Sequence, residues 1–166
     1  AYYRVEDADG NVVLEKDTVG EQVISRETSY IMNKLMERVI TAQGGTGTAA
    51  RISGVPVVGK TGTTSEDMDS TFVGLTPDYV SAVWYGYKDE HKQIPSGTYY
   101  SSSRIWRNVM ADILTSRPVG EFPSCDTVEE HRYCTQTGLL ARSDCPSTGV
   151  GYYKSSSLPD VCDAAH

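Results

Sequence analysis

One short stretch of the sequence fits two different patterns of catalytic residues. It reads GVPVVGKTGTT, from Gly54 to Thr64. Residues 54–61 match G-x-x-x-x-G-K-[ST], the loop that cradles nucleotide phosphates, and residues 60–62 form the K-T-G triplet of enzymes that are acylated on a serine. The two patterns need different backbones, because a phosphate loop curls around its anion and the triplet lies on a strand. Only one of them can describe this chain.

The residues inside the stretch disfavour the phosphate loop. Residues 55–58 are Val-Pro-Val-Val, and β-branched side chains resist the positive φ values of a curled loop, while proline removes a backbone donor. Gly62 and its neighbouring threonines discourage the helix that must follow such a loop. No apolar strand precedes it, since residues 44–53 read GGTGTAARIS. These features argue against nucleotide binding.

A strand accounts for the same residues better. Val57 and Val58 can anchor it by burial, Gly59 and Gly62 permit close backbone approach, and Lys60 can present a positive charge. A positive charge flanked by hydroxyls suits a carboxylate-bearing substrate. A solvent-facing lysine among edge threonines is the alternative, because triplets recur by chance, so the surrounding sequence has to decide.

Two helices and several strands are predicted around this stretch. Residues 2–5 and 12–14 flank the turn sequence DADGN and predict a hairpin. Residues 25–42 and 101–116 show helical spacing, with Ser25 as the first N-cap and Ser102 or Ser103 as the second. Their predicted buried stripes are Ile31, Met32, Leu35, Met36, Val39 and Ile40 in the first helix, and Ile105, Trp106, Val109, Met110, Ile113 and Leu114 in the second.

Three strands joined by short links are expected at residues 55–63, 72–75 and 79–87, which predicts an antiparallel sheet. The fold class is therefore α+β, an antiparallel sheet with flanking helices. We expect residues 1–117 to form this part and residues 118–166 to form an irregular, cysteine-containing extension that needs covalent or docking support.

Composition limits the class of protein. The 166 residues are 39% hydrophobic and 22% charged, with a net charge of -7 and no basic run interleaved with aromatics. Nucleic acid is therefore not an expected partner. No segment reaches the roughly 18 consecutive apolar residues of a membrane span, so the chain is expected to be soluble, with any export signal outside this sequence.

The four cysteines, Cys125, Cys134, Cys145 and Cys162, all lie in the extension. Their even number indicates disulfides in an oxidising compartment, and a Cys134–Cys145 pair is the first expectation of three possible pairings. A zinc site with His131 or His166 is an alternative because Cys162 and His166 have C-x-x-x-H spacing, but no C-x-x-C pair supports it. Free thiols are a third alternative. No metal and no other cofactor is expected.

The context of the triplet resembles a known family. Residues 45–87, GTGTAARISGVPVVGKTGTTSEDMDSTFVGLTPDYVSAVWYGY, are similar to the C-terminal part of the transpeptidase domain of class A, bifunctional penicillin-binding proteins. The approach G-T-G-T-A-A, the K-T-G-T-T segment, the D-x-x-F-V-G segment and the V-W-x-G strand come in the family's order. The tail, with CTQTGLLARSDCP and VCDAAH, resembles the extension of Gram-positive members. The pair Ser70-Thr71 departs from the family, which usually carries an aromatic before the phenylalanine.

The resemblance implies a partial serine β-lactamase-like fold and a peptidoglycan D,D-transpeptidase that cross-links stem peptides ending in D-Ala-D-Ala and is inhibited by β-lactams. Two of the family's three motifs, S-x-x-K with the nucleophile and S-x-N, are not found in this sequence. His91, His131 and His166 form no triad-like arrangement with Ser and Asp. The simplest interpretation is a C-terminal piece of a longer protein, inactive alone, whose missing partner is the N-terminal part of the same domain.

By the same resemblance, the catalytic residues in this chain are Lys60 and Thr63, whose backbone N-H is an oxyanion-hole donor. The residues implied to bind the substrate are Lys60, Thr61, Gly62, Thr63 and Thr64. The parent protein would be anchored at the extracellular face of the cytoplasmic membrane. A non-catalytic binding module derived from this fold remains an alternative function. Self-association of the fragment through its uncovered sheet is a further expectation.

Overall fold

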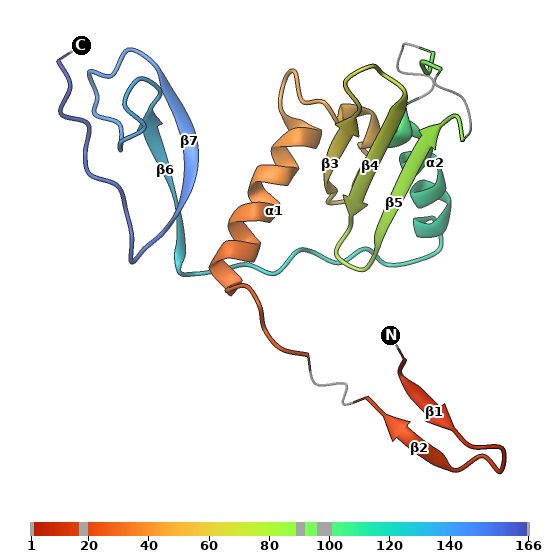
Figure 1. The fold of residues 1–166 in the computed structure, drawn as a ribbon. Helices are drawn as coiled ribbons and strands as arrows, with labels where there is room; N and C mark the ends of the chain where they lie inside the picture. The colour runs from red at the N-terminus through yellow and green to blue at the C-terminus, as the bar shows by residue number, and fades with distance from the viewer. Residues whose placement is uncertain (1, 17–19, 89–91, 96–100, 166) are drawn as a thin grey trace.

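The computed structural model describes residues 2–16, 20–88, 92–95 and 101–165. Figure 1 shows how the elements are arranged. In chain order they are β1 (Arg4–Glu6), β2 (Val12–Glu15), α1 (Arg26–Thr41), the short 3-10 helix η1 (Thr48–Ala50), β3 (Val58–Thr63), β4 (Asp69–Leu75), β5 (Val80–Gly86), α2 (Ser102–Leu114), β6 (Val128–Cys134) and β7 (Thr148–Lys154). The strands pair antiparallel throughout, so the predicted α+β class is confirmed.

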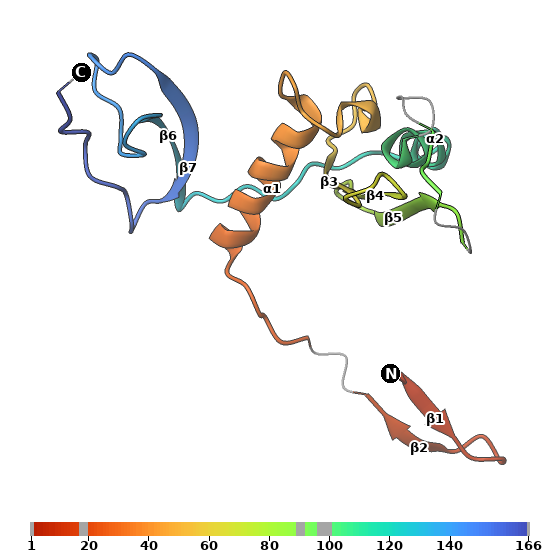
Figure 2. The same ribbon diagram turned by 45° about the horizontal axis from the view of Figure 1, so that its top comes forward.

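The central sheet has the strand order β3-β4-β5, as predicted. Both helices lie on the same face of this sheet, which Figure 2 shows from its edge. Phe72 on β4 and Trp106 on α2 meet edge to face, with ring centroids 5.3 Å apart. The buried cluster around them is Ile40, Ala50, Val57, Phe72, Trp106, Met110 and Leu114. Burial of this apolar surface holds the helices on the sheet.

The N-caps of the two helices differ in how well the sequence predicts them. Ser25 caps α1 as predicted, and its hydroxyl accepts a hydrogen bond from the Thr28 backbone N-H at 3.2 Å. The prediction of Ser102 or Ser103 for α2 is wrong, because Ser101 is the cap and accepts from Arg104 N-H at 3.3 Å. Ser102 is instead buried, with its Oγ 2.8 Å from that of Ser70 on β4. A tertiary partner therefore uses the hydroxyl that the local sequence offered for capping.

The predicted apolar stripes of the helices are only partly buried. On α1, Met32 and Leu35 are 46% and 49% exposed, and on α2, Val109 and Ile113 are 52% and 40% exposed. A three-stranded sheet covers only one flank of each helix, so the outer residues of each stripe stay in solvent. Periodicity identified both helices correctly but overstated how much of each is covered.

All three strands of the central sheet begin at residues other than those predicted, and β5 differs least, starting at Val80 rather than at residue 79. β3 starts at Val58 rather than at residue 55, and β4 starts at Asp69 rather than at Phe72. The Asp69 carboxylate accepts a hydrogen bond from Trp84 Nε1 at 3.0 Å, and its backbone carbonyl accepts from Thr64 N-H at 3.2 Å. The first bond joins β4 to β5 and the second continues the β3-β4 pairing, so β4 extends into a segment that reads as a polar turn.

The hairpin formed by β1 and β2 confirms the prediction from DADGN. Asp7 Oδ1 accepts from the backbone N-H groups of Asp9 and Asn11, and Gly10 adopts a φ of +83°. In Figures 1 and 2 the hairpin stands away from the helices and the central sheet. Its strand residues are all exposed, so local turn chemistry and strand pairing hold it.

The extension is more ordered than the predicted irregular tail. β6 and β7 form a second antiparallel hairpin, seven residues on each side. It lies on the opposite side of α1 from the central sheet (Figure 1) and contacts that helix. The Thr127 hydroxyl donates to Glu27 Oε1 at 2.9 Å. Strand pairing and docking on α1 therefore supply the support that the polar composition demands.

Candidate functional site

The K-T-G segment lies on β3, an edge strand of the central sheet. Lys60 pairs with Val73, which pairs with Ala82, and all three are exposed on the face that the helices leave uncovered. Thr61 pairs with Phe72, whose ring is buried under the helices. Successive side chains of a strand alternate between faces. Lys60 and Thr61 therefore leave the strand on opposite sides.

The Lys60 amine nevertheless returns to the next residue. Its Nζ donates to the backbone carbonyl of Thr61 at 2.7 Å. The Thr61 hydroxyl lies 2.8 Å from that of Thr46, in the loop between α1 and η1. An ammonium group and a paired hydroxyl thus belong to one short piece of strand. Together they can bind a carboxylate that approaches this edge of the sheet.

The other two threonines of the stretch have different surroundings. Thr63 is exposed at the end of β3, opposite Ser70. Thr64 follows the strand, and its hydroxyl accepts from the backbone N-H groups of Met68 and Asp69 at 3.1 and 2.9 Å. The Thr64 hydroxyl thus closes the turn into β4, whereas the end of β3 at Thr63 is open to solvent.

Close packing explains both glycines of β3. A Cβ on Gly59 would lie 2.6 Å from the Phe72 ring and 2.7 Å from the Val73 carbonyl. A Cβ on Gly62 would lie 2.4 Å from the Thr71 hydroxyl, which donates to the Gly62 carbonyl at 3.2 Å. Because real Cβ contacts of this length do not occur, neither position accepts a side chain without movement of its neighbour.

The backbone also decides between the two patterns of the sequence. From Val58 to Thr63 the chain is an extended strand that pairs along its length with β4. A phosphate loop requires its lysine to open a helix at this point. Lys60 instead lies in the middle of the strand, so residues 54–61 do not form a phosphate-binding loop.

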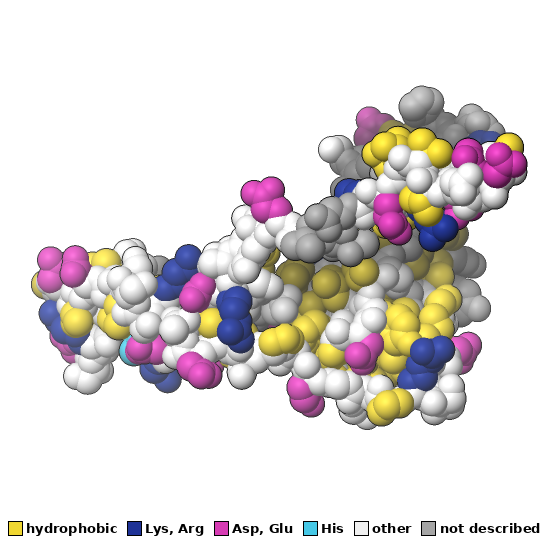
Figure 3. Space-filling model, turned by 90° about the horizontal axis from the view of Figure 1, so that it is seen from below, with side chains coloured by type: hydrophobic (Ala, Val, Ile, Leu, Met, Phe, Trp, Pro, Cys, Tyr) yellow, Lys and Arg dark blue, Asp and Glu magenta, His cyan; other side chains and the backbone are white. Residues whose placement is uncertain are grey.

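Apolar side chains share the uncovered face of the sheet with Lys60. Val73, Val80 and Trp84 are 45%, 68% and 55% exposed there. Figure 3 shows hydrophobic side chains gathered at the surface of the part of the molecule that carries the sheet. Exposed apolar patches of this kind mark contact surfaces.

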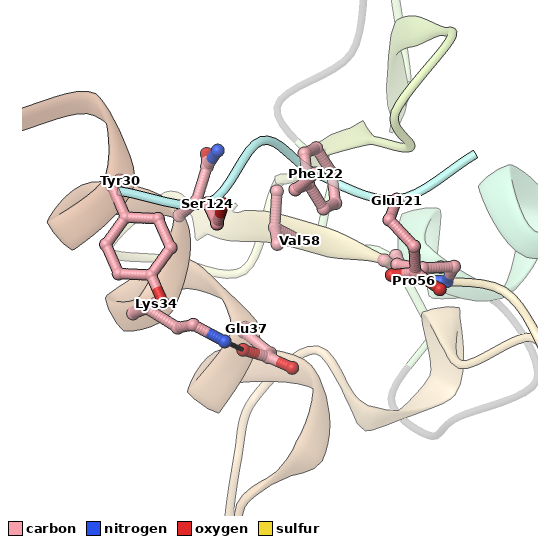
Figure 4. Close-up of a pocket in the computed structure, with 10 residues that line it drawn as sticks. Tyr30, Lys34, Glu37, Pro56, Val58, Glu121, Phe122 and Ser124 are labelled. Carbon is pink, nitrogen blue, oxygen red and sulfur yellow. Dashed lines mark hydrogen bonds and ion pairs between the residues drawn. The ribbon is translucent and has the colours of Figure 1, made fainter. Parts of the chain in front are cut away.

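Two cavities lie away from the K-T-G segment. The first, of about 170 Å³, is bounded by α1, by the start of β3 and by residues 121–124 (Figure 4). Within it, Lys34 Nζ lies 3.1 Å from Glu37 Oε2, and this hydrogen bond raises the pKa of Lys34. The second, of about 290 Å³, lies beside Ser25 and Pro123. Both are smaller than a typical small-molecule site of roughly 300–1,000 Å³.

The histidines show no catalytic arrangement among the residues that the structure describes. His131 lies on β6 with Nε2 2.8 Å from Glu129 Oε2. His91 and His166 lie outside the described residues. In the described segments no helix is both long enough and apolar enough to cross a bilayer.

Three cysteine sulfurs lie close together, whereas the sequence led us to expect one pair. The sulfurs of Cys134 and Cys145 are close, but the sulfur of Cys162 lies within 4.8 Å of both. Burial raises the pKa of the Cys134 thiol, yet hydrogen bonds from the backbone N-H groups of Thr137 and Gln136 and from the Thr137 hydroxyl outweigh it and lower this pKa to about 6. Sequence spacing gave no sign of the third sulfur.

Sequence reasoning did not predict that Thr46 contacts the K-T-G segment. Thr46 belongs to the G-T-G-T-A-A stretch, 15 residues before its hydrogen-bond partner Thr61. The helix C-terminus and η1 turn this loop back toward β3, where Gly47 is buried and its N-H donates to the Val39 carbonyl at 3.0 Å.

Known proteins of one family are similar to this chain. A family described as "Penicillin binding protein transpeptidase domain" matches residues 4–114. A penicillin-binding protein 1A of Clostridium tetani is 32% identical over 98% of this chain, and one of Clostridium novyi is 43% identical over 84% of it. The matches cover 21% and 16% of those proteins, so the chain spans about a fifth of their length.

The fold has a solved counterpart as well. The crystal structure of penicillin-binding protein 1A from Haemophilus influenzae matches with a TM-score of 0.62 at 19% identity, over 82% of this chain and 21% of that one. At this identity the likeness concerns the fold alone. On the family match and the identity to the clostridial proteins, this chain belongs to the penicillin-binding protein transpeptidase family.

Proposed function

We propose that residues 60–64 form one wall of the active site of a peptidoglycan D,D-transpeptidase, a longer protein of which this chain is the C-terminal part. Membership of the family supports the reaction class. The observation that carries the proposal is the edge strand β3, which carries the exposed Lys60 ammonium and, on the strand's other side, the Thr61 hydroxyl next to Thr46. The site would lie on the extracellular side of the cytoplasmic membrane.

The proposed chemistry divides the work between this chain and the rest of the protein. A serine outside this chain attacks the carbonyl carbon between the two D-alanines of a stem peptide, and the terminal D-alanine leaves as the new acyl-serine forms. An amine of a neighbouring stem then takes the acyl group and frees the serine. A β-lactam reacts with the same serine through its ring amide.

Lys60 and Thr61 would hold the carboxylate of the terminal D-alanine, or that of a β-lactam, through charge-assisted hydrogen bonds. The Thr63 N-H, at the open end of β3, would donate to the oxyanion of the tetrahedral intermediate. Gly62 would keep a bulky side chain away from the substrate. Thr64 would contribute through the turn that it closes, which holds the end of the strand.

The uncovered sheet face fits the same proposal. Val73, Val80 and Trp84 would pack against the N-terminal part of the domain. In the isolated chain this face would remain in solvent or be hidden by self-association. The isolated chain is therefore expected to be inactive, since it supplies one wall and no nucleophile.

The test is covalent labelling with a fluorescent penicillin. We expect the longer protein to be labelled and the isolated 166-residue chain to remain unlabelled on a denaturing gel. Replacing Lys60 with alanine should lower the acylation rate roughly 10- to 100-fold, the value of a hydrogen bond to a charged group. The matched control is Lys16→Ala, which removes an exposed lysine beyond β2.

Two results would overturn the proposal. The first is a labelled band from the isolated chain, since that would place a nucleophile within it. The second is wild-type acylation by a folded Lys60→Ala protein. Circular dichroism and thermal unfolding of both lysine variants show whether the fold is kept, which we expect because Lys60 is exposed.

A further inference from the structure

Three cysteine side chains meet in the extension, away from the K-T-G segment. Among the residues that the structure describes, the sulfurs of Cys134, Cys145 and Cys162 all lie within 4.8 Å of one another. Cys134 and Cys162 are 0% and 1% exposed, and Cys145 is half-buried. Residues separated by 11 and 17 positions in the sequence are thus brought together in a partly enclosed place.

Backbone hydrogen bonds build this meeting point. Cys134 ends β6, and the chain turns back at once, because Gly138 N-H donates to the Cys134 carbonyl and Cys134 N-H donates to the Leu139 carbonyl, both at 2.8 Å. Gly138 has a φ of +77°, which a glycine adopts without strain. Cys162 N-H donates to the Leu140 carbonyl at 2.8 Å, so the same turn also fixes the third cysteine.

Hydrogen-bond donors point at the sulfurs. The backbone N-H groups of Thr137 and Gln136 donate to the Cys134 sulfur. Arg142 N-H donates to Cys145 Sγ, and the Thr137 hydroxyl donates to Cys162 Sγ, each at 3.4 Å. Donors of this kind stabilise negative charge on sulfur and orient it, as the outer-shell groups of thiolate metal sites do.

Positive charge lies close to the same sulfurs. The guanidinium of Arg142 is held by Asp144, and it also interacts electrostatically with Cys162 and Cys145. Three thiolates around one divalent ion carry a net charge of about -1, and Arg142, which also pairs with Asp144, offsets part of it. The arginine therefore suits a loaded thiolate site.

The number and spacing of the sulfurs favour a metal over a disulfide. A disulfide joins two sulfurs at about 2.05 Å, so it would include only two of these three close sulfurs. Zinc bound to sulfur at about 2.3 Å in a tetrahedron holds its ligands about 3.8 Å apart, which is the scale of this cluster. Small adjustments of three side chains would bring all of them onto one ion.

We propose that Cys134, Cys145 and Cys162 bind one zinc ion as thiolates in a structural site of the extension. Each thiol releases a proton when its sulfur bonds to the ion, so three protons leave for each zinc bound. Soft sulfur ligands select zinc over magnesium or calcium, which take oxygen ligands. The described residues supply three ligands, and the sequence places His166 four residues after Cys162, outside the described residues.

This site needs no C-x-x-C pair. The turn after β6 and the β6-β7 pairing bring distant cysteines together, so tertiary contacts replace sequence proximity. The ion would tie the end of β6 to the last residues of the chain. That link would stabilise a segment whose sequence has few large apolar side chains.

The first measurement is the metal content of the 166-residue chain, purified with reductant and with zinc supplied, then dialysed. We expect about one zinc ion per chain for the wild type and for Cys125→Ser. Cys125 is the matched control, because it is not one of the three mutually close sulfurs and its Sγ lies 3.4 Å from the Thr127 hydroxyl. We expect Cys145→Ser and Cys162→Ser to retain less than a tenth of the wild-type zinc.

A second measurement does not depend on the folding of any variant. Cobalt added to the reduced, metal-free wild type should give the sulfur-to-cobalt charge-transfer absorption and the strong visible bands of a tetrahedral thiolate site. Less than a tenth of an ion per chain in the reduced, folded wild type, with no such bands, would overturn the proposal. A disulfide in place of the metal would also overturn it. The sign of that disulfide is a chain mass two hydrogens below that of the reduced chain, lost in Cys134→Ser, in protein that takes up no zinc after reduction.

Discussion

The hydroxyl of Thr61 on β3 lies 2.8 Å from the hydroxyl of Thr46 in the loop that follows α1. Fifteen residues separate them in the sequence, and Thr61 belongs to the K-T-G segment. Either hydroxyl can donate the hydrogen bond, and a hydroxyl can form more than one, so the Thr61 hydroxyl can still bind a second group. The pair therefore holds the Thr61 side chain in position while its oxygen remains able to bind a carboxylate.

Changing each member of this pair separates positioning from substrate binding. We predict that Thr61→Val lowers the rate of penicillin acylation in the longer protein roughly 10- to 100-fold, because it removes a hydrogen bond to a charged group. Thr46→Val breaks the same hydroxyl pair but leaves the Thr61 hydroxyl, so its rate should stay within roughly threefold of wild type. Stopped-flow or gel-based acylation rates provide the measurement. Equal losses in the two variants would mean that Thr61 acts only through Thr46.

Gly62 and Thr71 offer a test of why a glycine follows Thr61. We predict that Gly62→Ala lowers the free energy of unfolding by about 1–3 kcal/mol, because its Cβ would lie 2.4 Å from the Thr71 hydroxyl. Thr71→Ala alone should cost about 1 kcal/mol through loss of the 3.2 Å bond to the Gly62 carbonyl. The double variant should lose less free energy of unfolding than the two single variants lose in total. Urea denaturation of all four proteins gives the coupling, and strict additivity would refute the steric explanation.

The free energy of unfolding should depend on pH through Glu27, in the first turn of α1. Its pKa is lowered from 4.5 to about 2, first by its own backbone N-H and then by the hydroxyls of Ser25 and Thr127. A lowered pKa means that the folded state favours the carboxylate. The stabilisation is therefore fully present above pH 4.5 and is lost as the pH falls toward 2.

The experiment compares denaturation midpoints of the wild type and Glu27→Gln at pH 7 and at pH values between 4.5 and 2. We predict that the wild type is the more stable at pH 7 and that the difference shrinks across the acid range. Glu21→Gln, which removes one negative charge from an exposed position ahead of α1, is the control for the loss of a carboxylate. A Glu27→Gln difference that is constant from pH 7 to pH 2 would contradict the assignment.

Much of the fold follows from local patterns in the sequence. Helical spacing predicted α1 and α2, the DADGN turn predicted the first hairpin, and short links predicted the antiparallel order of β3, β4 and β5. Ser25 was identified as a cap because its neighbours form a regular helix start. These features depend on residues close together in the chain, where backbone sterics and local hydrogen bonds dominate.

The remaining features depend on partners distant in sequence. Ser101 caps α2 while Ser102 bonds to Ser70, and Met32 and Leu35 stay exposed because the sheet covers only one flank of α1. No local pattern carries this information. The same is true of the β6-β7 hairpin, whose polar sequence reads as irregular until the strands pair and dock on α1.

By itself, the sequence predicted a strand at residues 55–63 that carries the K-T-G triplet, since valines and proline cannot curl around a phosphate, and it pointed to the penicillin-binding protein family, since the surrounding motifs come in a known order. Only the tertiary structure decided that Lys60 and Thr61 leave opposite faces of an edge strand, that Thr46 pairs with Thr61, and that three cysteines meet. The physical reason is chain topology: strand register and turns set which distant side chains come within hydrogen-bonding distance, and composition does not record them.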